Sequence, residues 1–232
     1  MLQARCPTLG FGARLCQEGF ATKAWRECDE TTAPGSVALG GSYARSVPRP
    51  PRNLFAGIYH LAAHGSDTRH LFLRDEDREE FLERLAAIWA YFELALLSYV
   101  LMGSHYHAVV RIPDARLSQA LYHLHTDYSR WHNRRHGRSA HLFRAHALTR
   151  RITSDRQLIA ACRYLARNPV VAGLVTDPLE WPWSSARAHA GLERPRIPIA
   201  ESDLRAAFGD TDDWRERYRT TVEPDDEDRR AA

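Results

Sequence analysis

The sequence predicts an α+β domain of the ferredoxin-like, split βαβ type, with an antiparallel sheet and helices on one of its faces. The first observation is that apolar residues alternate between a period of two and a period of about 3.6 along residues 54–168, as strands and helices require. The second is the order of these segments, which is strand, helix, strand, strand, helix, strand. The third is a Gly-Ser turn between the two middle strands, which predicts a hairpin.

The first strand and the first helix are expected at residues 54–63 and 75–92, with a loop at 66–74 between them. The helix should begin at Asp75-Glu76-Asp77, because acidic side chains in a first turn interact favourably with the helix dipole. Apolar residues at helical spacing then give it one buried face; they are Phe81, Leu85, Ile88 and Phe92.

The hairpin follows, with strands at residues 93–101 and 105–112 joined by Gly103-Ser104. A second helix begins after Pro113-Asp114 and is expected to end near Gly137. Its apolar residues share one face, which is directed at the sheet; they are Leu117, Leu121, Leu124, Tyr128 and Trp131.

The last strand is predicted at residues 144–152, and Ser154-Asp155 is expected to cap a third helix. Because proline has no amide hydrogen to donate, this helix should end at Asn168-Pro169. Cys162 lies on the apolar face of the helix and is expected to be a small buried hydrophobe.

Three regions are predicted along the chain. Residues 1–46 show no periodicity and are expected to be a poorly ordered N-terminal extension. The domain itself spans residues 47–190 and opens with a Pro/Arg arm, whose Arg49 and Arg52 are expected to contact phosphates. A C-terminal extension at residues 191–232 adds helices and ends in an acidic tail.

Composition excludes several classes of protein. No apolar run approaches the roughly 20 residues that a membrane-spanning helix needs, and the N-terminus lacks the features of a signal peptide, so a cytoplasmic protein is expected. The four cysteines contain no C-x-x-C pair, which argues against a disulfide framework and against a zinc ribbon.

Positive charge gathers in the middle of the chain. Between Arg111 and Arg163 there are 11 arginines and only three acidic residues, whereas the chain as a whole carries a net charge of +3. A basic middle with an acidic tail is common in nucleic-acid-binding proteins, although a solvated basic face would have the same composition.

Two features of the pattern could carry chemistry. Side chains alternate along a strand, so His105 and His107 share one face and could bind one metal ion, or could simply form hydrogen bonds. Tyr128 faces the sheet, as a nucleophile that meets a metal on the sheet must, although this is also where a core tyrosine would lie. Tyr122 is about 240° away around the helix and cannot share that site.

Four blocks of the sequence resemble the IS200-like, single-tyrosine HUH transposases, and most of all the transposases associated with repetitive extragenic palindromes. The similarity covers about residues 50–190, and the blocks occur in the family's order and spacing; they are Tyr99–His107, Tyr128–Arg138, Asn168–Leu174 and Trp181–Ser185.

The resemblance implies a set of roles. His105 and His107 would be metal ligands for Mg²⁺, or alternatively Mn²⁺, and Tyr128 would be the nucleophile. The neighbouring Asn133 or His132 would be the third ligand. The last two blocks are interpreted as structural, with Trp183 as a buried aromatic rather than a base-stacking surface. The predicted DNA contacts besides Arg49 and Arg52 are Arg130, Arg134, Arg135 and Arg138.

The chain departs from the family pattern at three places. Gly103-Ser104 stands where the family commonly has Pro-Asn, and Trp131 stands where it commonly has a second tyrosine. The usual Gly-Arg-Phe-Lys/Arg run is here Ala145-His146-Ala147-Leu148, which removes basic residues from a DNA-facing segment. We therefore expect weaker DNA binding rather than altered chemistry.

Together these features predict a metal-dependent tyrosine transposase or nuclease that cuts single-stranded DNA at hairpins through a 5′-phosphotyrosine intermediate. Its partner would be single-stranded or hairpin DNA, and the protein would act as a monomer or a homodimer. Two alternatives come from other classes. One is a non-catalytic, domesticated protein that binds DNA or RNA hairpins, which the loss of basic residues favours. The other is a zinc-dependent hydrolase.

Overall fold

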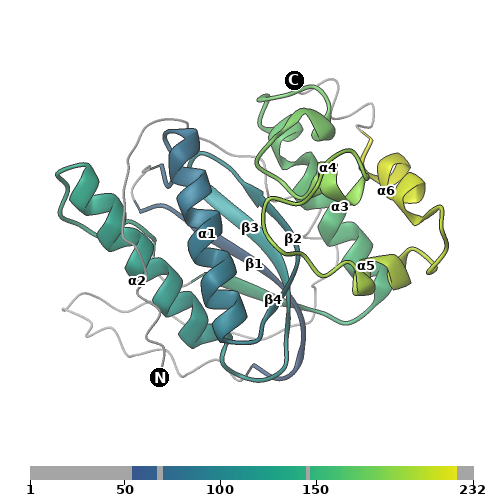
Figure 1. Cartoon of the computed structure of the whole chain (residues 1–232), viewed down its shortest axis with the longest axis horizontal. Helices are drawn as coiled ribbons and strands as arrows, with labels where there is room; N and C mark the ends of the chain where they lie inside the picture. The colour runs from purple at the N-terminus through teal and green to yellow at the C-terminus, as the bar shows by residue number, and fades with distance from the viewer. Residues whose placement is uncertain (1–53, 67–69, 145–146, 224–232) are drawn as a thin grey trace, which may run out of the picture.

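The computed structural model describes residues 54–66, 70–144 and 147–223. The described residues form one four-stranded antiparallel sheet in the order β2-β3-β1-β4 (Figure 1). Its strands are β1 (Gly57–His64), β2 (Ala95–Leu101), β3 (His105–Ile112) and β4 (Leu148–Ile152). The element order and the sheet confirm the predicted α+β, split βαβ fold.

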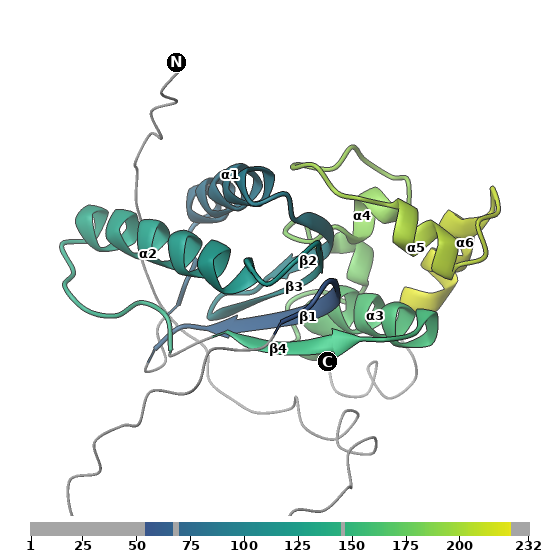
Figure 2. The same ribbon diagram turned by 90° about the horizontal axis from the view of Figure 1, so that it is seen from below.

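The helices divide between the two faces of the sheet. The helices α1 (Asp75–Tyr91) and α2 (Leu117–Arg135) lie side by side on one face, as predicted, whereas α3 (Asp155–Val171) covers the other (Figure 2). The alternation of β3 shows the same division. Tyr106 belongs to the core beneath α1 and α2, while Val109 belongs to the core beneath α3.

Several predicted boundaries were wrong. The first strand begins at Gly57 rather than at residue 54, the second at Ala95 rather than at 93, and the last at Leu148 rather than at 144. The helix α3 continues past Pro169 to Val171, because the loss of one backbone donor at a proline does not prevent the next bond, from the Ala172 amide to the Asn168 carbonyl (3.1 Å). The helix ends where Gly173 adopts a positive φ of 65°, which glycine accommodates without strain.

The remaining elements are short and lie on the outer side of α3. They are η2 (Pro178–Glu180), α4 (Ala186–His189), α5 (Ser202–Ala207) and α6 (Trp214–Val222). Their buried side chains form one core with Cys162, which is buried as predicted, and with Leu165 of α3. None of the helices in the described part of the chain is long and apolar enough to cross a membrane.

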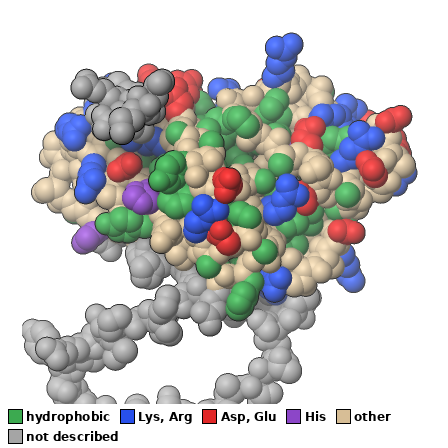
Figure 3. All heavy atoms as spheres, turned by 60° about the horizontal axis from the view of Figure 1, so that its bottom comes forward, with side chains coloured by type: hydrophobic (Ala, Val, Ile, Leu, Met, Phe, Trp, Pro, Cys, Tyr) green, Lys and Arg blue, Asp and Glu red, His purple; other side chains and the backbone are tan. Residues whose placement is uncertain are grey.

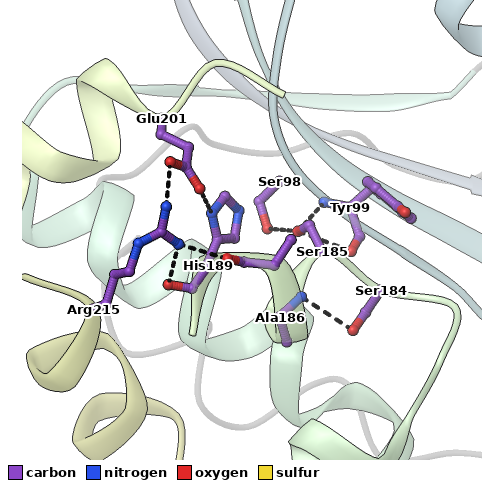
Figure 4. A network of polar contacts seen from close by, with 9 residues as sticks. Ser98, Tyr99, Ser184, Ser185, Ala186, His189, Glu201 and Arg215 are labelled. Atoms are coloured by element: carbon purple, nitrogen blue, oxygen red, sulfur yellow. Dashed lines mark hydrogen bonds and ion pairs between the residues drawn. The ribbon is translucent and has the colours of Figure 1, made fainter. Parts of the chain in front are cut away.

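The segment after α3 is bound to β2 by a polar network (Figure 4). The Ser185 hydroxyl lies 2.9 Å from that of Ser98 and accepts a hydrogen bond from the Tyr99 amide (3.0 Å). Nearby, the Arg215 guanidinium donates to Glu201 (2.7 Å) and to the Ala188 carbonyl (2.6 Å). Trp183 is buried as predicted, and its carbonyl accepts from the amide of Leu101 in β2 (2.8 Å). This network holds the C-terminal helices, and through them α3, against the sheet.

Candidate active site

A cluster of four histidines lies on the sheet face that α3 covers. His60 and His64 project from β1, and His105 and His107 project from the neighbouring strand β3. In the register of the two strands His64 is opposite His105, and their rings stack with centroids 4.9 Å apart. The His60 Nε2 lies 3.1 Å from the His107 Nδ1, and the rings of His105 and His107 are 5.1 Å apart. We call these four residues the histidine cluster.

Helix α3 adds a tyrosine and an asparagine to the histidine cluster. Tyr164 and Asn168 are four residues apart, so both lie on the same side of the helix. The Asn168 Oδ1 lies 3.2 Å from the His105 Nε2, and the Tyr164 ring is 5.3 Å from that of His107 and 5.9 Å from that of His60. A phenol, an amide and imidazoles therefore meet between β3 and α3.

Burial keeps the imidazoles of the cluster neutral. It lowers the pKa of His105 to about 4, with a smaller contribution from the charge of His64, and the pKa of His60 to about 4, with a contribution from Arg150. The pKa of His107 lies well below its ordinary value for the same reason. A neutral imidazole has one unprotonated ring nitrogen, and this is the form that binds metal ions.

Burial changes the pKa of Tyr164 in the opposite direction. It raises the pKa of the phenol above 10, while a side-chain hydrogen bond with Asn168 opposes this rise. Tyr164 is only partly buried. It is thus held beside the imidazoles by a polar partner on its own helix.

The predicted nucleophile, Tyr128, does not lie at the histidine cluster. It is fully buried on the opposite face of the sheet, beneath α1 and α2. Its hydroxyl donates to the Leu71 carbonyl (2.6 Å), and its ring packs against those of Phe81 (5.1 Å) and Trp131 (5.4 Å). Burial raises its pKa well above 10. The predicted meeting of Tyr128 with the metal histidines was therefore wrong, because strand alternation turns His105 and His107 away from α2.

The two residues predicted as the third ligand also lie on α2, on the face of the sheet opposite the histidine cluster. His132 is fully buried on α2, with its ring 6.1 Å from that of Tyr128. Asn133 is one position further along α2, and its amide donates to the Ala140 carbonyl (2.8 Å). Neither contacts His105 or His107. The amide that does is that of Asn168, from the block Asn168–Leu174, for which a structural role was predicted.

The predicted DNA contacts in the described residues do not lie at the histidine cluster. Arg130, Arg134 and Arg135 are exposed on α2, which packs against the other face of the sheet, and Arg138 follows that helix. Arg130 is 3.8 Å from Asp127. Arg49 and Arg52 lie outside the described residues. On the side of the molecule seen in Figure 3, basic and acidic side chains are mixed and form no continuous basic surface.

The site offers a small set of metal-binding atoms. Within residues 54–66, 70–144 and 147–223, no three histidine, cysteine, aspartate or glutamate side chains are placed to hold one metal ion. The available set is instead two imidazoles, His105 and His107, and the amide oxygen of Asn168, which already meets the His105 nitrogen. Such a set fits a divalent cation that takes its other ligands from phosphate or water oxygens.

A signal for Tyr164 and Asn168 was present in the sequence. On β3 the positions that alternate with the histidines are Tyr106, Ala108 and Val110, which lie in the core beneath α1 and α2. The histidines lie on the other face and have a different helix as their neighbour. The third helix presents Tyr164 and Asn168 at the spacing of one turn, so a phenol and an amide share one side of that helix.

Comparison with known proteins gives one family and one related structure. A family model described as "Transposase IS200 like" matches residues 53–166, which include His105, His107 and Tyr164. A structure of a REP-associated tyrosine transposase bound to a REP hairpin superposes with a TM-score of 0.52 at 14% sequence identity, covering 64% of this chain and 88% of the other. At that identity the similarity concerns the fold. No curated protein matches the sequence.

Proposed function

Residues 53–166 of the chain belong to the IS200-like transposase family, and on this premise we propose that the protein cuts and rejoins single-stranded DNA at hairpins with Tyr164 as its nucleophile. The observation that carries this proposal is the meeting of Tyr164 and Asn168 with His105 and His107 on one face of the sheet. The fold shared with a hairpin-bound transposase supports hairpin DNA as the substrate. The protein would act in the cytoplasm, on DNA.

The reaction follows from the position of the phenol. The Tyr164 oxygen attacks the scissile phosphorus, a new O–P bond forms, and the bond from phosphorus to the 3′ oxygen breaks. The 3′ oxygen leaves as a hydroxyl, taking up one proton for the proton that the phenol loses. The tyrosine keeps the 5′-phosphate, so the energy of the phosphodiester is conserved and a different 3′-hydroxyl can reverse the reaction. This reversal is the strand transfer that a transposase requires.

The residues of the site divide the remaining work. Asn168 orients the phenol, because its amide contacts both Tyr164 and His105. His105, His107 and Asn168 would hold a divalent cation, which when bound neutralises charge on a phosphate oxygen. Mg²⁺ is the proposed ion and Mn²⁺ the alternative, since imidazole binds Mn²⁺ more readily than Mg²⁺.

His60 has a positioning role. Its Nε2 lies 3.1 Å from the His107 Nδ1, so one proton shared by this pair fixes which nitrogen of His107 has a free lone pair. Partners of this kind orient metal-binding histidines in general and raise their basicity.

The test is the formation of a covalent adduct. Hairpin DNA with single-stranded flanks, labelled at its 3′ end, is incubated with the protein and Mg²⁺ or Mn²⁺ and then denatured. The wild-type chain and Tyr128→Phe should both give a labelled band at the size of the protein, whereas Tyr164→Phe should give none. Phe keeps the ring and removes only the oxygen, so Tyr164→Phe should still bind the hairpin.

Other outcomes would select other functions. An adduct that persists in Tyr164→Phe and disappears in Tyr128→Phe would overturn the assignment of the nucleophile. Binding without an adduct for any hairpin would favour a non-catalytic hairpin-binding protein. Cleavage that survives loss of both hydroxyls would favour a metal-dependent hydrolase.

A further inference from the structure

The edge strand β4 lies next to β1, the strand that carries His60 and His64 of the histidine cluster. In the register of β1 and β4, Arg150 is opposite His60 and Leu148 is opposite Ala62. Residues that face one another across two strands project from the same side of the sheet. The side chains of Arg150 and Leu148 therefore project from the face that carries the histidine cluster.

A third residue, Arg144, lies on the same face just before β4. Its amide donates to the His64 carbonyl (2.8 Å), which places it beside His64. The preceding residue, Phe143, packs toward Tyr128 on the other face, with ring centroids 6.2 Å apart. Gly65 and Phe143 form an antiparallel bridge, so Arg144 is opposite His64 and projects from the face of the histidine cluster.

These three side chains are open to solvent and differ in character. Leu148 is 66% exposed, which is high for a large apolar side chain, and Arg144 and Arg150 are also exposed. The charge of Arg150 reaches His60 and that of Arg144 reaches His64, where each contributes to the lowered pKa of the histidine. An apolar side chain thus stands between two cations at the margin of the candidate active site.

We propose that Arg144, Leu148 and Arg150 bind the single-stranded segment of DNA that enters the active site, with the two arginines on phosphates and Leu148 against a base or sugar. This inference rests on the proposed function. Guanidinium groups pair with phosphate oxygens through two hydrogen bonds, and an exposed apolar side chain next to them gives a nucleobase a surface to cover. Leu148 and Arg150 are about 7 Å apart along the strand, within the reach of one nucleotide.

The assignment also accounts for a departure from the family pattern. The stretch Ala145–Leu148 lacks the family's basic residues, which predicted weaker DNA binding. The arginines that border it in the sequence, Arg144 and Arg150, bring positive charge to the same edge of the sheet. The charge needed for a phosphate chain is therefore present, at shifted positions.

A matched control variant is available on the same strand, at Arg151. Arg151 carries the same charge as Arg150 and is its neighbour on β4, but it is opposite Tyr59 and so projects from the other face. Its guanidinium donates to the Ala56 carbonyl (3.2 Å). Arg151→Gln therefore removes the same charge from the same strand without touching the histidine cluster.

The experiment measures binding of the full chain to a fluorescent hairpin DNA with single-stranded flanks, between about 50 and 200 mM salt. Arg144→Gln and Arg150→Gln should each weaken binding about tenfold, and the double variant should reduce the slope of log affinity against log salt by about 1.4. Leu148→Ser should weaken binding without changing that slope, because it removes no charge. Arg151→Gln should stay within about twofold of wild type. Melting temperatures of all variants check that each is folded.

The outcomes separate this inference from the proposed function. If Arg151→Gln weakens binding as much as Arg150→Gln, or if the double variant binds like wild type, the three residues are not the binding surface. Either result stands independently of the adduct test, which leaves Arg144, Leu148, Arg150 and Arg151 unchanged. A wild-type chain that forms the adduct while the double variant binds normally overturns this inference alone.

Discussion

The two faces of the sheet each receive a tyrosine from a helix, and the surroundings of the two tyrosines differ. On the face of α1 and α2, Tyr128 is fully buried among aromatic rings and its hydroxyl donates to a backbone carbonyl. On the face of α3, Tyr164 is partly exposed and has imidazoles and the Asn168 amide as neighbours. Both point at the sheet, so orientation does not distinguish them. The two tyrosines are distinguished by their access to solvent and by their polar partners.

The histidines follow the same division. On the first face His132 is fully buried, and the partly buried His125 lies 2.8 Å from the Tyr106 hydroxyl and stacks on Phe143. On the second face the histidine cluster borders the exposed side chains of β4. One face therefore stabilises the domain, and the other combines the groups that are proposed to carry out the phosphodiester chemistry.

The largest expected effect is on stability, and it concerns the two tyrosines. Tyr128→Ala should lower the free energy of unfolding by about 3–5 kcal/mol, because it leaves a cavity beneath α1 and α2 and an unpaired Leu71 carbonyl. Tyr164→Ala should lower the free energy of unfolding by less than half of that amount. Denaturant unfolding of both variants measures the difference. Equal losses would mean that α3 holds Tyr164 as tightly as the core holds Tyr128.

The second prediction concerns metal binding at the two faces. His105→Ala should weaken Mn²⁺ binding by more than about a hundredfold, since it removes a proposed ligand rather than a supporting residue. His132→Ala should leave the affinity for Mn²⁺ unchanged and should instead lower the melting temperature, because that ring fills the core. Titration followed by the electron paramagnetic resonance of free Mn²⁺ measures the affinity. Weaker Mn²⁺ binding in His132→Ala would contradict the division between the faces.

A smaller effect is expected within the histidine cluster. His60→Ala should weaken Mn²⁺ binding about tenfold to a hundredfold, because it removes the partner of the His107 Nδ1. His64→Ala is the matched control, since His64 is exposed and contacts His105 through ring stacking. Its affinity for Mn²⁺ should stay within a few-fold of wild type. If His64→Ala has the larger effect, then His64 is itself a ligand.

The smallest expected effect is a pH dependence of the free energy of unfolding, and it arises from His125 on the face of α1 and α2. Burial lowers the pKa of His125 from 6.5 to about 3, so the unfolded chain binds this proton more readily than the folded chain. The contribution of His125 is therefore complete above pH 6.5 and is lost as the pH falls toward 3. Between pH 7 and 5.5 the wild type should lose about 1 kcal/mol more stability than His125→Gln. The free energy of unfolding of both proteins is measured at the two pH values. If the wild type and His125→Gln lose the same amount, His125 is protonated without cost.

Much of the fold was determined by the sequence alone, because strands and helices have local signatures. The alternation along residues 105–112 placed His105 and His107 on one face and Tyr106 on the other, and the structure confirms this strand to the residue. The helical spacing of Leu117 to Trp131 likewise identified a helix with one buried face. These patterns depend on residues a few positions apart, so they can be recognised in a single sequence.

What only the tertiary structure decided is which helix covers which face. The pairing of Tyr164 with His107 joins residues 57 positions apart, and it depends on α3 packing against the sheet together with α5 and α6. No local periodicity encodes that packing, because an apolar helix face fits either side of a sheet whose two faces are both buried. Tyr128 and Tyr164 therefore gave similar local patterns, and long-range burial separated the core residue from the proposed nucleophile.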